Sequence, residues 1–338
     1  MRASTTEAEE QPGRDGPACA HIVLYRSDGS DRDLAIDEID PPDDENDLLW
    51  VDIDCDAPQL VEQVARRLGL PPEVLPHLTG FGQAPLLRSY GNYLVIQAVV
   101  ADHAGELRFD GVVLTIAAGP EFVLTVHHRP IEFIRAIRKR EHGDTRLGML
   151  SEASFVVSLL DWQLGSYFAA VSDFEREVER LEQDVLRNRY DQSTNELSRM
   201  RKGASRLRRM LAPHRRLFAS LARPDFHPDH DAQVTRQFQV LNENFERAMD
   251  VVENARDLVI GSFELFTNQI ALRTNRSMQL LTFATVVIGC QTVIAGVLGM
   301  NFDAPFFRTA ALGFWVAIGG MLAVTVIAAI VGKYKKWF

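Results

Sequence analysis

Short runs of apolar residues alternate with polar segments through the first third of the chain. Five of these runs are rich in β-branched residues, which predicts strands. They cover residues 21–25, 48–53, 93–100, 111–118 and 121–127. Residues 57–69 carry apolar side chains at helical spacing and stop at a glycine, which indicates a helix. The LPPEVLPHLTG segment that follows suggests a second, shorter helix. Together these elements predict a small α/β domain over residues 20–145.

The middle of the chain has a helical pattern. No proline occurs from Ile131 to Ala212. Within this stretch, apolar residues recur at alternating steps of three and four, at Val171, Phe174, Val178, Leu181 and Val185. Such spacing is typical of a seam between packed helices. We therefore expect long antiparallel helices over residues 146–230, with a break near residues 187–194.

A further helical face follows, and the sequence shows no strong break between Asp231 and Leu298. The apolar positions of this face are Phe238, Leu241, Phe245, Met249 and Val252. At ~1.5 Å per residue, a helix of this length would span roughly 100 Å. A globular core does not need that length, so the pattern predicts a stalk helix over 231–276 that continues into a membrane.

Two segments near the C-terminus, 277–302 and 309–332, contain no charged residue. Each exceeds the ~20 residues needed to cross a bilayer, so we predict two transmembrane helices joined by a short outer loop, 303–308. The basic residues lie outside the spans: Arg273 and Arg276 precede the first, and a basic tail, 333–338, follows the second. The positive-inside rule therefore places both termini in the cytoplasm.

One set of positions along the first span recurs at steps of three or four and carries amide, hydroxyl and glycine groups beside two apolar side chains; it comprises Asn275, Met278, Leu281, Thr285, Gly289, Thr292, Gly296 and Gly299. This spacing puts them on one face of a helix. The face could pack against another helix, although the amide and hydroxyl groups would then need partners. Alternatively, it could line a pore. Two spans cannot enclose a pore, so the second interpretation requires a homo-oligomer with the first span inside.

Composition narrows the class of protein. The formal net charge is -10, which disfavours nucleic acid as a partner. The three cysteines are far apart and form no CxxC pair, so a zinc cluster or disulfide framework is not expected and a reducing compartment fits. Residues 1–19 lack the apolar region of a secretory signal and are expected to be a disordered tail.

Two charged segments admit two interpretations each. The acidic residues of 31–47 suit a solvated loop or a cation-attracting surface, and the basic run 198–216 suits a solvated helix face or an RNA or anionic-lipid site; we favour the first in both cases. The adjacent His127 and His128 should point to opposite faces of a strand, and we expect them at the surface. The sequence shows no nucleophile elbow and no phosphate-binding loop, so an enzyme is not expected.

At the membrane segments the residues match a known family. The stretches RTNRSMQLLT and TVIAGVLGMNF, a short loop and a second span ending in KYKKWF closely resemble the CorA-type divalent cation transporters, whose signature is Gly-Met-Asn at the end of the first span. The resemblance implies an α+β membrane protein with a cytoplasmic α/β domain, a helical stalk and two C-terminal transmembrane helices. It further implies a funnel-shaped homopentamer in the bacterial inner membrane that takes up Mg²⁺, with Co²⁺ or Ni²⁺ as further cargo. No cofactor is implied, although Mg²⁺ could also regulate.

The resemblance also assigns roles to residues. It implies a selectivity filter of Gly299, Met300 and Asn301, with Asp303 at the outer mouth. The pore-lining face would be the stripe described above, from Asn275 to Gly296, with Met278 and Leu281 matching a hydrophobic gate. The basic collar at the pore exit would be Lys333, Lys335 and Lys336.

The chain departs from the family pattern in places. Gly289 stands where a bulky methionine is usual, and Cys290 stands at a proline position. Val240 occupies the position of a regulatory carboxylate, which leaves Glu243, one turn on, as a weak substitute in a metal-sensing site. Two alternative functions remain: a proton-coupled Zn²⁺ transporter of the same superfamily, against which Met300 argues, and a membrane-anchored cytosolic scaffold, which would not explain the polar stripe.

Overall fold

The computed structural model describes residues 19–42, 44, 47–54, 56–80, 82, 85–103, 105, 108–139, 150–186, 193–223, 226, 232–300 and 310–334. The chain divides into two units, Met1–Ile260 and Gly261–Phe338, which are described separately below. Several predicted features lie outside the described residues: most of the N-terminal tail, the outer loop 303–308, and the residues Asn301, Asp303, Lys335 and Lys336.

The first unit is built on a seven-stranded mixed sheet with the order β2-β1-β3-β7-β6-β5-β4. Its strands are β1 (Ala20–Tyr25), β2 (Arg32–Asp33), β3 (Leu48–Ile53), β4 (Leu86–Tyr90), β5 (Tyr93–His103), β6 (Phe109–Gly119) and β7 (Phe122–Val126). β3 and β7 run parallel, and the other neighbours pair antiparallel. The two-residue turn between β4 and β5 contains Gly91 at a positive φ of 63°, a conformation that glycine adopts at little cost.

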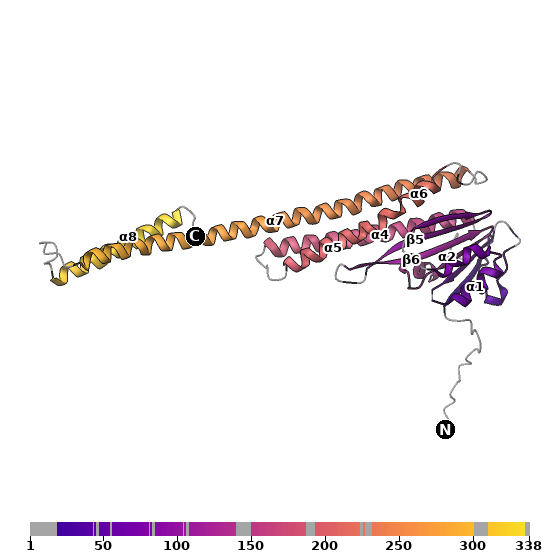
Figure 1. Ribbon diagram of the computed structural model, residues 1–338, viewed down its shortest axis with the longest axis horizontal. Helices are drawn as coiled ribbons and strands as arrows, with labels where there is room; N and C mark the ends of the chain where they lie inside the picture. Colours follow the sequence, from indigo (N-terminus) through magenta and orange to yellow (C-terminus); the bar gives the residue numbers. More distant parts are fainter. Residues whose placement is uncertain are drawn as a thin grey trace, which may run out of the picture. The chain divides into compact units, whose positions relative to one another are not determined.

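Helices cover both faces of this sheet (Figure 1). On one face lie α1 (Pro58–Arg67), the 3-10 helix η2 (Pro72–Val74) and α2 (Leu75–Thr79), which bury Val61, Val64 and Leu68 against Val51 and Leu124 of the sheet. The other face is covered mainly by α4 (Glu152–Leu186), with α3 (Glu132–Arg138), α5 (Ser193–Leu211), the 3-10 helix η4 (Ala212–His214) and α6 (Arg215–Leu221) around it. The two faces of β3 therefore contact different helical layers.

The predicted apolar seams are confirmed. The four described seam positions of α4 are buried: Val171, Phe174, Val178 and Leu181. The side chain of Val185 lies outside the described part. The α7 helix (Ala232–Leu298) is one continuous helix of 67 residues, as expected, and its predicted face from Phe238 to Val252 is buried. Phe245 of this face stacks on Phe218 of α6 with ring centroids 4.9 Å apart.

Half of the β5 edge has no neighbouring strand among the described residues. β4 pairs with β5 only as far as Gln97, so the following backbone groups need other partners. Side chains of α4 provide them: Gln163 Nε2 donates to the Val99 carbonyl at 2.6 Å, and the Tyr167 hydroxyl donates to the same oxygen at 2.9 Å. The Ser166 hydroxyl accepts from the Ala101 amide at 3.0 Å. These bonds hold α4 to the sheet in a defined position.

The structure revises the interpretation of the acidic segment and agrees with that of the basic run. The acidic segment 31–47 is not simply a loop, because it contains β2 and the 3-10 helix η1 (Ile36–Glu38). Its acids form ion pairs, among them Glu38 with Arg32 at 2.9 Å. The basic run agrees with the favoured interpretation of a solvated face balanced by acid. Three of its arginines pair with nearby carboxylates: Arg206 with Asp110, Arg208 with Glu253, and Arg215 with Glu246.

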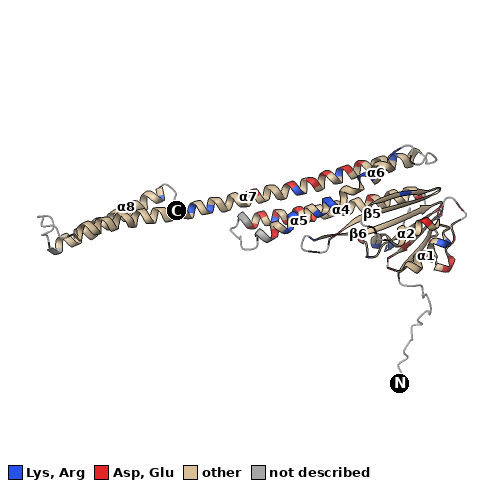
Figure 2. Cartoon of the chain, viewed as in Figure 1, with Lys and Arg blue, Asp and Glu red and all other residues tan. Residues whose placement is uncertain are grey.

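The second unit consists of the C-terminal part of α7 and the helix α8 (Ala310–Tyr334). Figure 2 shows that Lys, Arg, Asp and Glu are nearly absent from the paired part of these helices. Both helices contain segments long and apolar enough to cross a membrane, with mean hydropathy of 2.0 in α7 and 2.4 in α8. The positions of these apolar segments that are at least partly buried are Phe283, Val287, Gln291 and Leu298 in α7, and Gly313, Ala317, Met321, Ala328 and Gly332 in α8.

Candidate functional site

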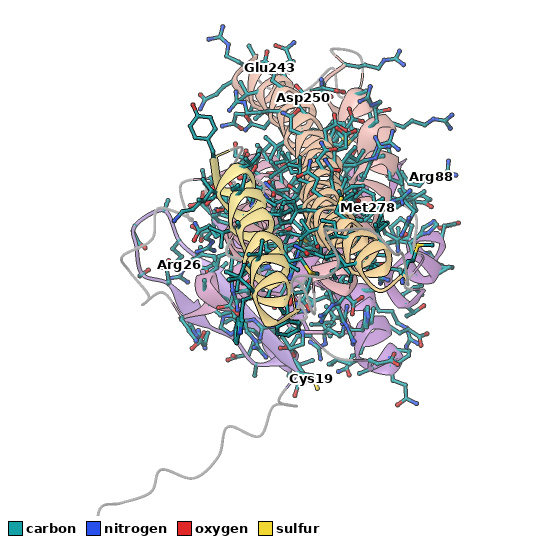
Figure 3. The ribbon with its side chains drawn as sticks, turned by 90° about the vertical axis from the view of Figure 1, so that its left-hand side faces the viewer. Cys19, Arg26, Arg88, Glu243, Asp250 and Met278 are labelled. Carbon is teal, nitrogen blue, oxygen red and sulfur yellow. The ribbon has the colours of Figure 1, made fainter. Side chains whose placement is uncertain are left out.

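The polar stripe of α7 lies on the side away from α8. At about 100° per residue, the stripe is centred roughly opposite the face that carries Phe283, Val287 and Gln291. In agreement, α8 leaves the whole stripe uncovered: Met278 and Leu281 are 62% and 69% exposed, and the remaining stripe positions are exposed as well. Figure 3 shows α8 beside the α7 segment that carries Met278. A hairpin in lipid therefore presents this face to something other than its own second helix.

The two threonines of the stripe are bonded within their own helix. The Thr285 hydroxyl donates to the Leu281 carbonyl at 2.8 Å, and the Thr292 hydroxyl donates to the Ile288 carbonyl at 2.8 Å. This corrects the expectation that packing would leave these hydroxyl groups without partners. Because each hydroxyl gives its hydrogen to the helix, its oxygen keeps acceptor capacity toward the open face. Such an oxygen suits a cation or its hydrating water.

The stripe glycines are not needed for contact with α8. A Cβ atom at Gly289 or Gly296 would meet nothing within 4 Å in the described chain. At Gly299, where α7 ends, it would lie 3.3 Å from the Ala295 carbonyl oxygen. Small residues in a membrane helix allow another helix to approach or leave an opening wider. Here the space beside Gly289 and Gly296 is available to a further copy of the chain or to a lumen.

The helix ends at the predicted filter. The Gly299 amide donates to the Ala295 carbonyl at 2.9 Å, and the Met300 amide donates to the Val297 carbonyl at 3.3 Å. Met300 is exposed. The next residue, Asn301, and the acidic Asp303 lie outside the described part, as do Lys335 and Lys336 of the predicted collar. Lys333 lies in the last turn of α8 and is exposed, and Asn275 is exposed on α7.

The positions considered for regulation lie in the first unit. Val240 is 48% exposed and lines a groove of about 470 Å³ between α4 and α7, where Asn244 donates to Asp161 at 2.9 Å. Glu243 is exposed on α7, and Figure 3 labels it together with Asp250. Within the described residues of one chain, no group of three or more His, Cys, Asp or Glu side chains could hold a metal ion. A regulatory site at Glu243 therefore remains a prediction about an interface between chains.

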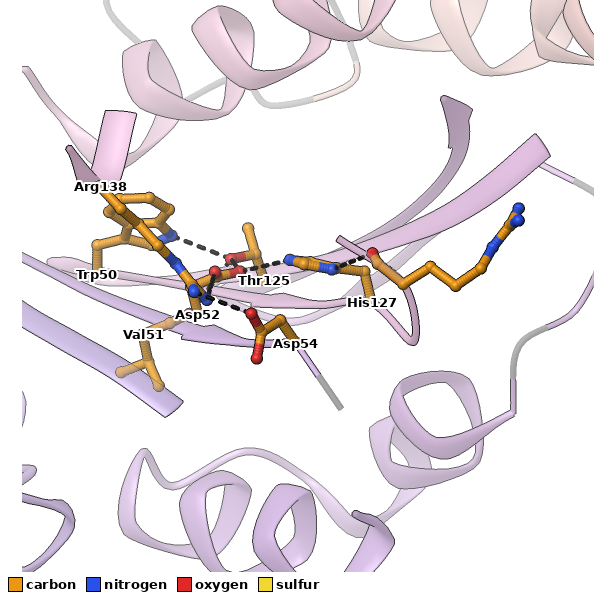
Figure 4. Close-up of polar contacts among 8 residues, drawn as sticks. Trp50, Val51, Asp52, Asp54, Thr125, His127 and Arg138 are labelled. Atoms are coloured by element: carbon orange, nitrogen blue, oxygen red, sulfur yellow. Dashed lines mark hydrogen bonds and ion pairs between the residues drawn. The ribbon is translucent and has the colours of Figure 1, made fainter. Parts of the chain in front are cut away.

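The expectation that both adjacent histidines are at the surface is wrong for His127. His128 is exposed, but His127 is 1% exposed and lies beside the fully buried Asp52 of β3 (Figure 4). Its Nε2 is 3.2 Å from Asp52 Oδ1, at ion-pair distance but without hydrogen-bond alignment. Its Nδ1 is 2.7 Å from the Arg129 carbonyl oxygen. His127 is therefore buried, and both of its ring nitrogens face protein groups.

Asp52 is the centre of a buried polar cluster. The Thr125 hydroxyl donates to it, the Arg138 guanidinium of α3 pairs with it, and Arg138 also donates to Asp54 at 3.0 Å (Figure 4). Burial by itself raises the pKa of Asp52, but the close approach of His127, with the charge of Arg138 and the hydrogen bond from Thr125, outweighs burial and holds the pKa below its usual range. The cluster joins the ends of β3 and β7 to α3. The signal in the sequence that could have indicated this cluster is Asp52 itself, an acidic residue within the otherwise apolar strand β3.

Comparison with known proteins decides the family. The profile of the family described as CorA-like Mg²⁺ transporter protein matches residues 45–333. The chain belongs to this family. It is therefore a divalent metal ion transporter of the CorA family, a membrane protein with two C-terminal transmembrane helices, and not an enzyme. The predictions of family and fold class are confirmed.

Individual relatives agree with this placement. The chain is 24% identical over 308 residues to the cobalt/magnesium transport protein CorA of Thermotoga maritima, covering 89% of this chain and 87% of that protein. The complete structure of the CorA magnesium transporter from Methanocaldococcus jannaschii matches with a TM-score of 0.72 at 18% identity, over 94% of this chain and 98% of the other. The full-length CmaX protein matches with a TM-score of 0.69 at 21% identity, over 96% and 100%. The two structural likenesses support the whole-chain fold.

Proposed function

We propose that this protein mediates uptake of Mg²⁺, and of Co²⁺ or Ni²⁺, through a homopentameric pore lined by the polar stripe of α7. The observation that carries the proposal is the packing of α8 on the opposite face of α7, which leaves Thr285, Gly289, Thr292 and Gly296 uncovered in a helix that crosses lipid. Polar backbone and side-chain groups facing lipid are costly, so this face needs protein or water against it. Copies of α7 around a common axis supply both.

The proposed mechanism keeps the ion largely hydrated. Mg²⁺ loses its water reluctantly, so a ring of Asn301 side-chain oxygens would accept hydrogen bonds from the waters of the ion rather than bind the metal directly. Conduction requires several weak sites rather than one strong site. The free lone pairs of Thr292 and Thr285, and the Asn275 amide nearer the cytoplasm, provide such sites along the same face. Asp303 at the mouth would raise the local cation concentration.

The direction of transport follows from the membrane potential. Arg273, Arg276 and the exposed Lys333 flank the spans on one side, which by the positive-inside rule is the cytoplasm of the bacterial inner membrane. With the interior negative, a divalent ion gains roughly 4–5 kcal/mol per 100 mV on entry, from ~2.3 kcal/mol per charge. Uptake down this gradient needs no ATP. The lysines at the exit would form the collar around the pore.

The test is ion flux into proteoliposomes, with Mg²⁺, Co²⁺, Ni²⁺ and Zn²⁺ compared for the wild type and Asn301→Ala. We expect Mg²⁺ flux that increases with an inside-negative potential and falls at least about tenfold in Asn301→Ala. Equal flux in both proteins would remove the amide ring from the mechanism. Zn²⁺ flux that depends on a proton gradient would transfer the protein to the alternative Zn²⁺ branch, and absence of flux for all four ions would favour a scaffold.

A further inference from the structure

Gln291 connects the two membrane helices by a pair of hydrogen bonds. It lies in α7 on the face toward α8, away from the polar stripe. Its Nε2 donates to the Met321 carbonyl oxygen at 2.7 Å and to the Thr325 hydroxyl oxygen at 2.8 Å. The Thr325 hydroxyl in turn donates to the Met321 carbonyl at 3.0 Å. The three groups therefore form a closed set of hydrogen bonds between helices.

The chemistry of the partners determines how the amide is oriented. A carbonyl oxygen can only accept, so the group of Gln291 that faces Met321 must be the NH₂ group. The Thr325 hydroxyl gives its own hydrogen to Met321 and can accept the second amide hydrogen. A rotated amide would place Oε1 against the Met321 carbonyl oxygen, which is repulsive. Both amide hydrogens are thus directed to α8.

The rest of the contact between the helices has little directional preference. Within the apolar span of α7 the other half-buried positions are Phe283, Val287 and Leu298, and the covered positions of α8 are mostly glycine and alanine. Lipid chains are as apolar as these side chains, so apolar contact alone only weakly resists a shift of one helix along the other. A shift by one turn would, however, remove Gln291 from both of its partners. The amide therefore sets the register of α8 against α7.

The amide is not the most stable choice for this position. Gln291 Oε1 is buried and has no hydrogen-bond partner among the described residues. A buried unpaired acceptor reduces the net gain from the two hydrogen bonds. An apolar side chain of similar size would avoid that cost. Polar residues in otherwise apolar interfaces are best attested as determinants of register, and this position has the features of one.

We infer that Gln291 is a positioning residue for transport: through Thr325 and the Met321 carbonyl it holds α8 in one register against α7, so that the pore-lining face keeps its height and orientation. The inference rests on the proposed pore lining by α7. Loss of the hydrogen bonds lets α8 shift, which changes how the stripe is presented and lowers the rate of ion passage. The residues that contact the ion are unchanged, so the preference among ions is retained.

The experiment is a double-mutant cycle on the full-length protein in proteoliposomes, with Gln291→Leu, Thr325→Val and the combination. Rates of Mg²⁺ and Co²⁺ uptake are measured per assembled oligomer. We expect each single variant to lower the Mg²⁺ rate at least about threefold, and the combination to be no slower than the slower single variant, because both changes remove the same contact. The ratio of Co²⁺ to Mg²⁺ rates should equal that of the wild type.

Two further variants make the test specific. Gln279→Leu makes the same chemical change at an exposed position of α7 and should retain the wild-type rate. The exchanged pair Gln291→Thr with Thr325→Gln places the amide on α8 and should recover at least about half of the rate lost in the single variants. Three results would overturn this inference alone. They are a rate loss in the combination equal to the product of the two single losses, a changed ratio of Co²⁺ to Mg²⁺ rates, or a wild-type rate in Gln291→Leu. Absence of flux in the wild type would overturn the proposed function first.

Discussion

The ring of His214 holds the free edge of β5 through the backbone of Val99. Nε2 of His214 accepts the hydrogen bond of the Val99 amide at 2.9 Å, while Nδ1 lies 3.0 Å from the Leu211 carbonyl oxygen. The carbonyl can only accept, so Nδ1 carries the hydrogen and the ring must be neutral to serve both partners. His214 also directly precedes α6, whose Phe218 stacks on Phe245 of α7. One neutral histidine thus links the sheet edge to the helical layer.

This link predicts a pH dependence of stability. Burial lowers the pKa of His214 from an ordinary 6.5 to about 4. Between these values the unfolded chain binds a proton that the folded chain excludes, so the free energy of unfolding falls as pH decreases from about 6.5 to about 4. The contribution over this window is about 3 kcal/mol, from ~1.36 kcal/mol per pH unit. It is fully present above pH 6.5.

The measurement is urea unfolding of the full-length protein in detergent at several pH values, for the wild type and His214→Gln. The Gln side chain retains an acceptor near Val99 but does not titrate in this range. We expect a shallower decline in the variant, with the difference confined to the window between pH 6.5 and 4. Hydrogen exchange of the Val99 amide should accelerate over the same window in the wild type. Parallel curves for both proteins would refute the role of His214.

A second prediction concerns the buried cluster of Asp52. Asp52→Asn removes the charge that compensates Arg138 and should destabilise the first unit by about 3–5 kcal/mol, the usual cost of breaking a buried pair. Because the pKa of Asp52 is held low, its contribution is present above pH 4 and is lost as pH falls through the lowered value. Thermal unfolding of both proteins at neutral pH checks the magnitude.

Asp54→Asn is the matched control. Asp54 also pairs with Arg138 but is partly exposed, so the same change should cost about 0–1 kcal/mol. Equal losses for the two variants would show that the cluster is not organised around Asp52.

Glycine positions allow a third test. At Gly119 of β6, an added Cβ would lie 2.6 Å from ring atoms of both Phe122 and Tyr93, so Gly119→Ala should destabilise by about 1–3 kcal/mol through overpacking. At Gly165 in α4, nothing lies within 4 Å of the added atom, and Gly165→Ala should stabilise by up to about 1 kcal/mol through helix propensity. Chemical unfolding should separate the two variants by sign. A loss of stability in Gly165→Ala would contradict the open space beside that residue, and an unchanged stability in Gly119→Ala would contradict the tight packing beside Gly119.

Much of the fold could be predicted where burial leaves a clear pattern. β3 and β7 are buried along their whole length, so their apolar runs located them almost to the residue. The edge strand β4, with the sequence LLRSY, and the seven-residue α3 were missed because both are short and only partly buried. The polar ends of β5 and β6, where Asp102 pairs with Asp110, extended these strands beyond their apolar runs. The pattern of apolar residues in the sequence thus predicts which segments are buried better than it predicts which segments form backbone hydrogen bonds.

The candidate site likewise contains one feature that the sequence pattern predicts and others that it does not. The recurrence of positions at steps of three and four predicts the stripe of α7, and the sequence also shows that Gln291 is a polar residue outside the stripe. Its partners on α8 could not be found from sequence, because α8 has almost no amphipathic pattern and its one threonine, Thr325, does not by itself define the face that meets α7. His127 was misplaced for a related reason: a strand pattern predicts which face a side chain takes, but not that Asp52 and Arg138 accompany it into the interior.

The last prediction tests the stripe itself. Thr292→Val keeps the shape of the side chain but removes the hydroxyl oxygen that faces the uncovered side of α7. Because that hydroxyl bonds only to its own helix in the described chain, the substitution should change the thermal stability by less than about 1 kcal/mol. If the face lines a pore, the Mg²⁺ rate should nevertheless fall at least about threefold, since one weak site for the hydrated ion is lost. Val293→Thr, which adds a hydroxyl at an exposed position on another face, is the matched control and should leave the rate unchanged. A normal rate in Thr292→Val, or an equal loss in the control, would mean that this face is a packing surface between helices and that the ions pass elsewhere.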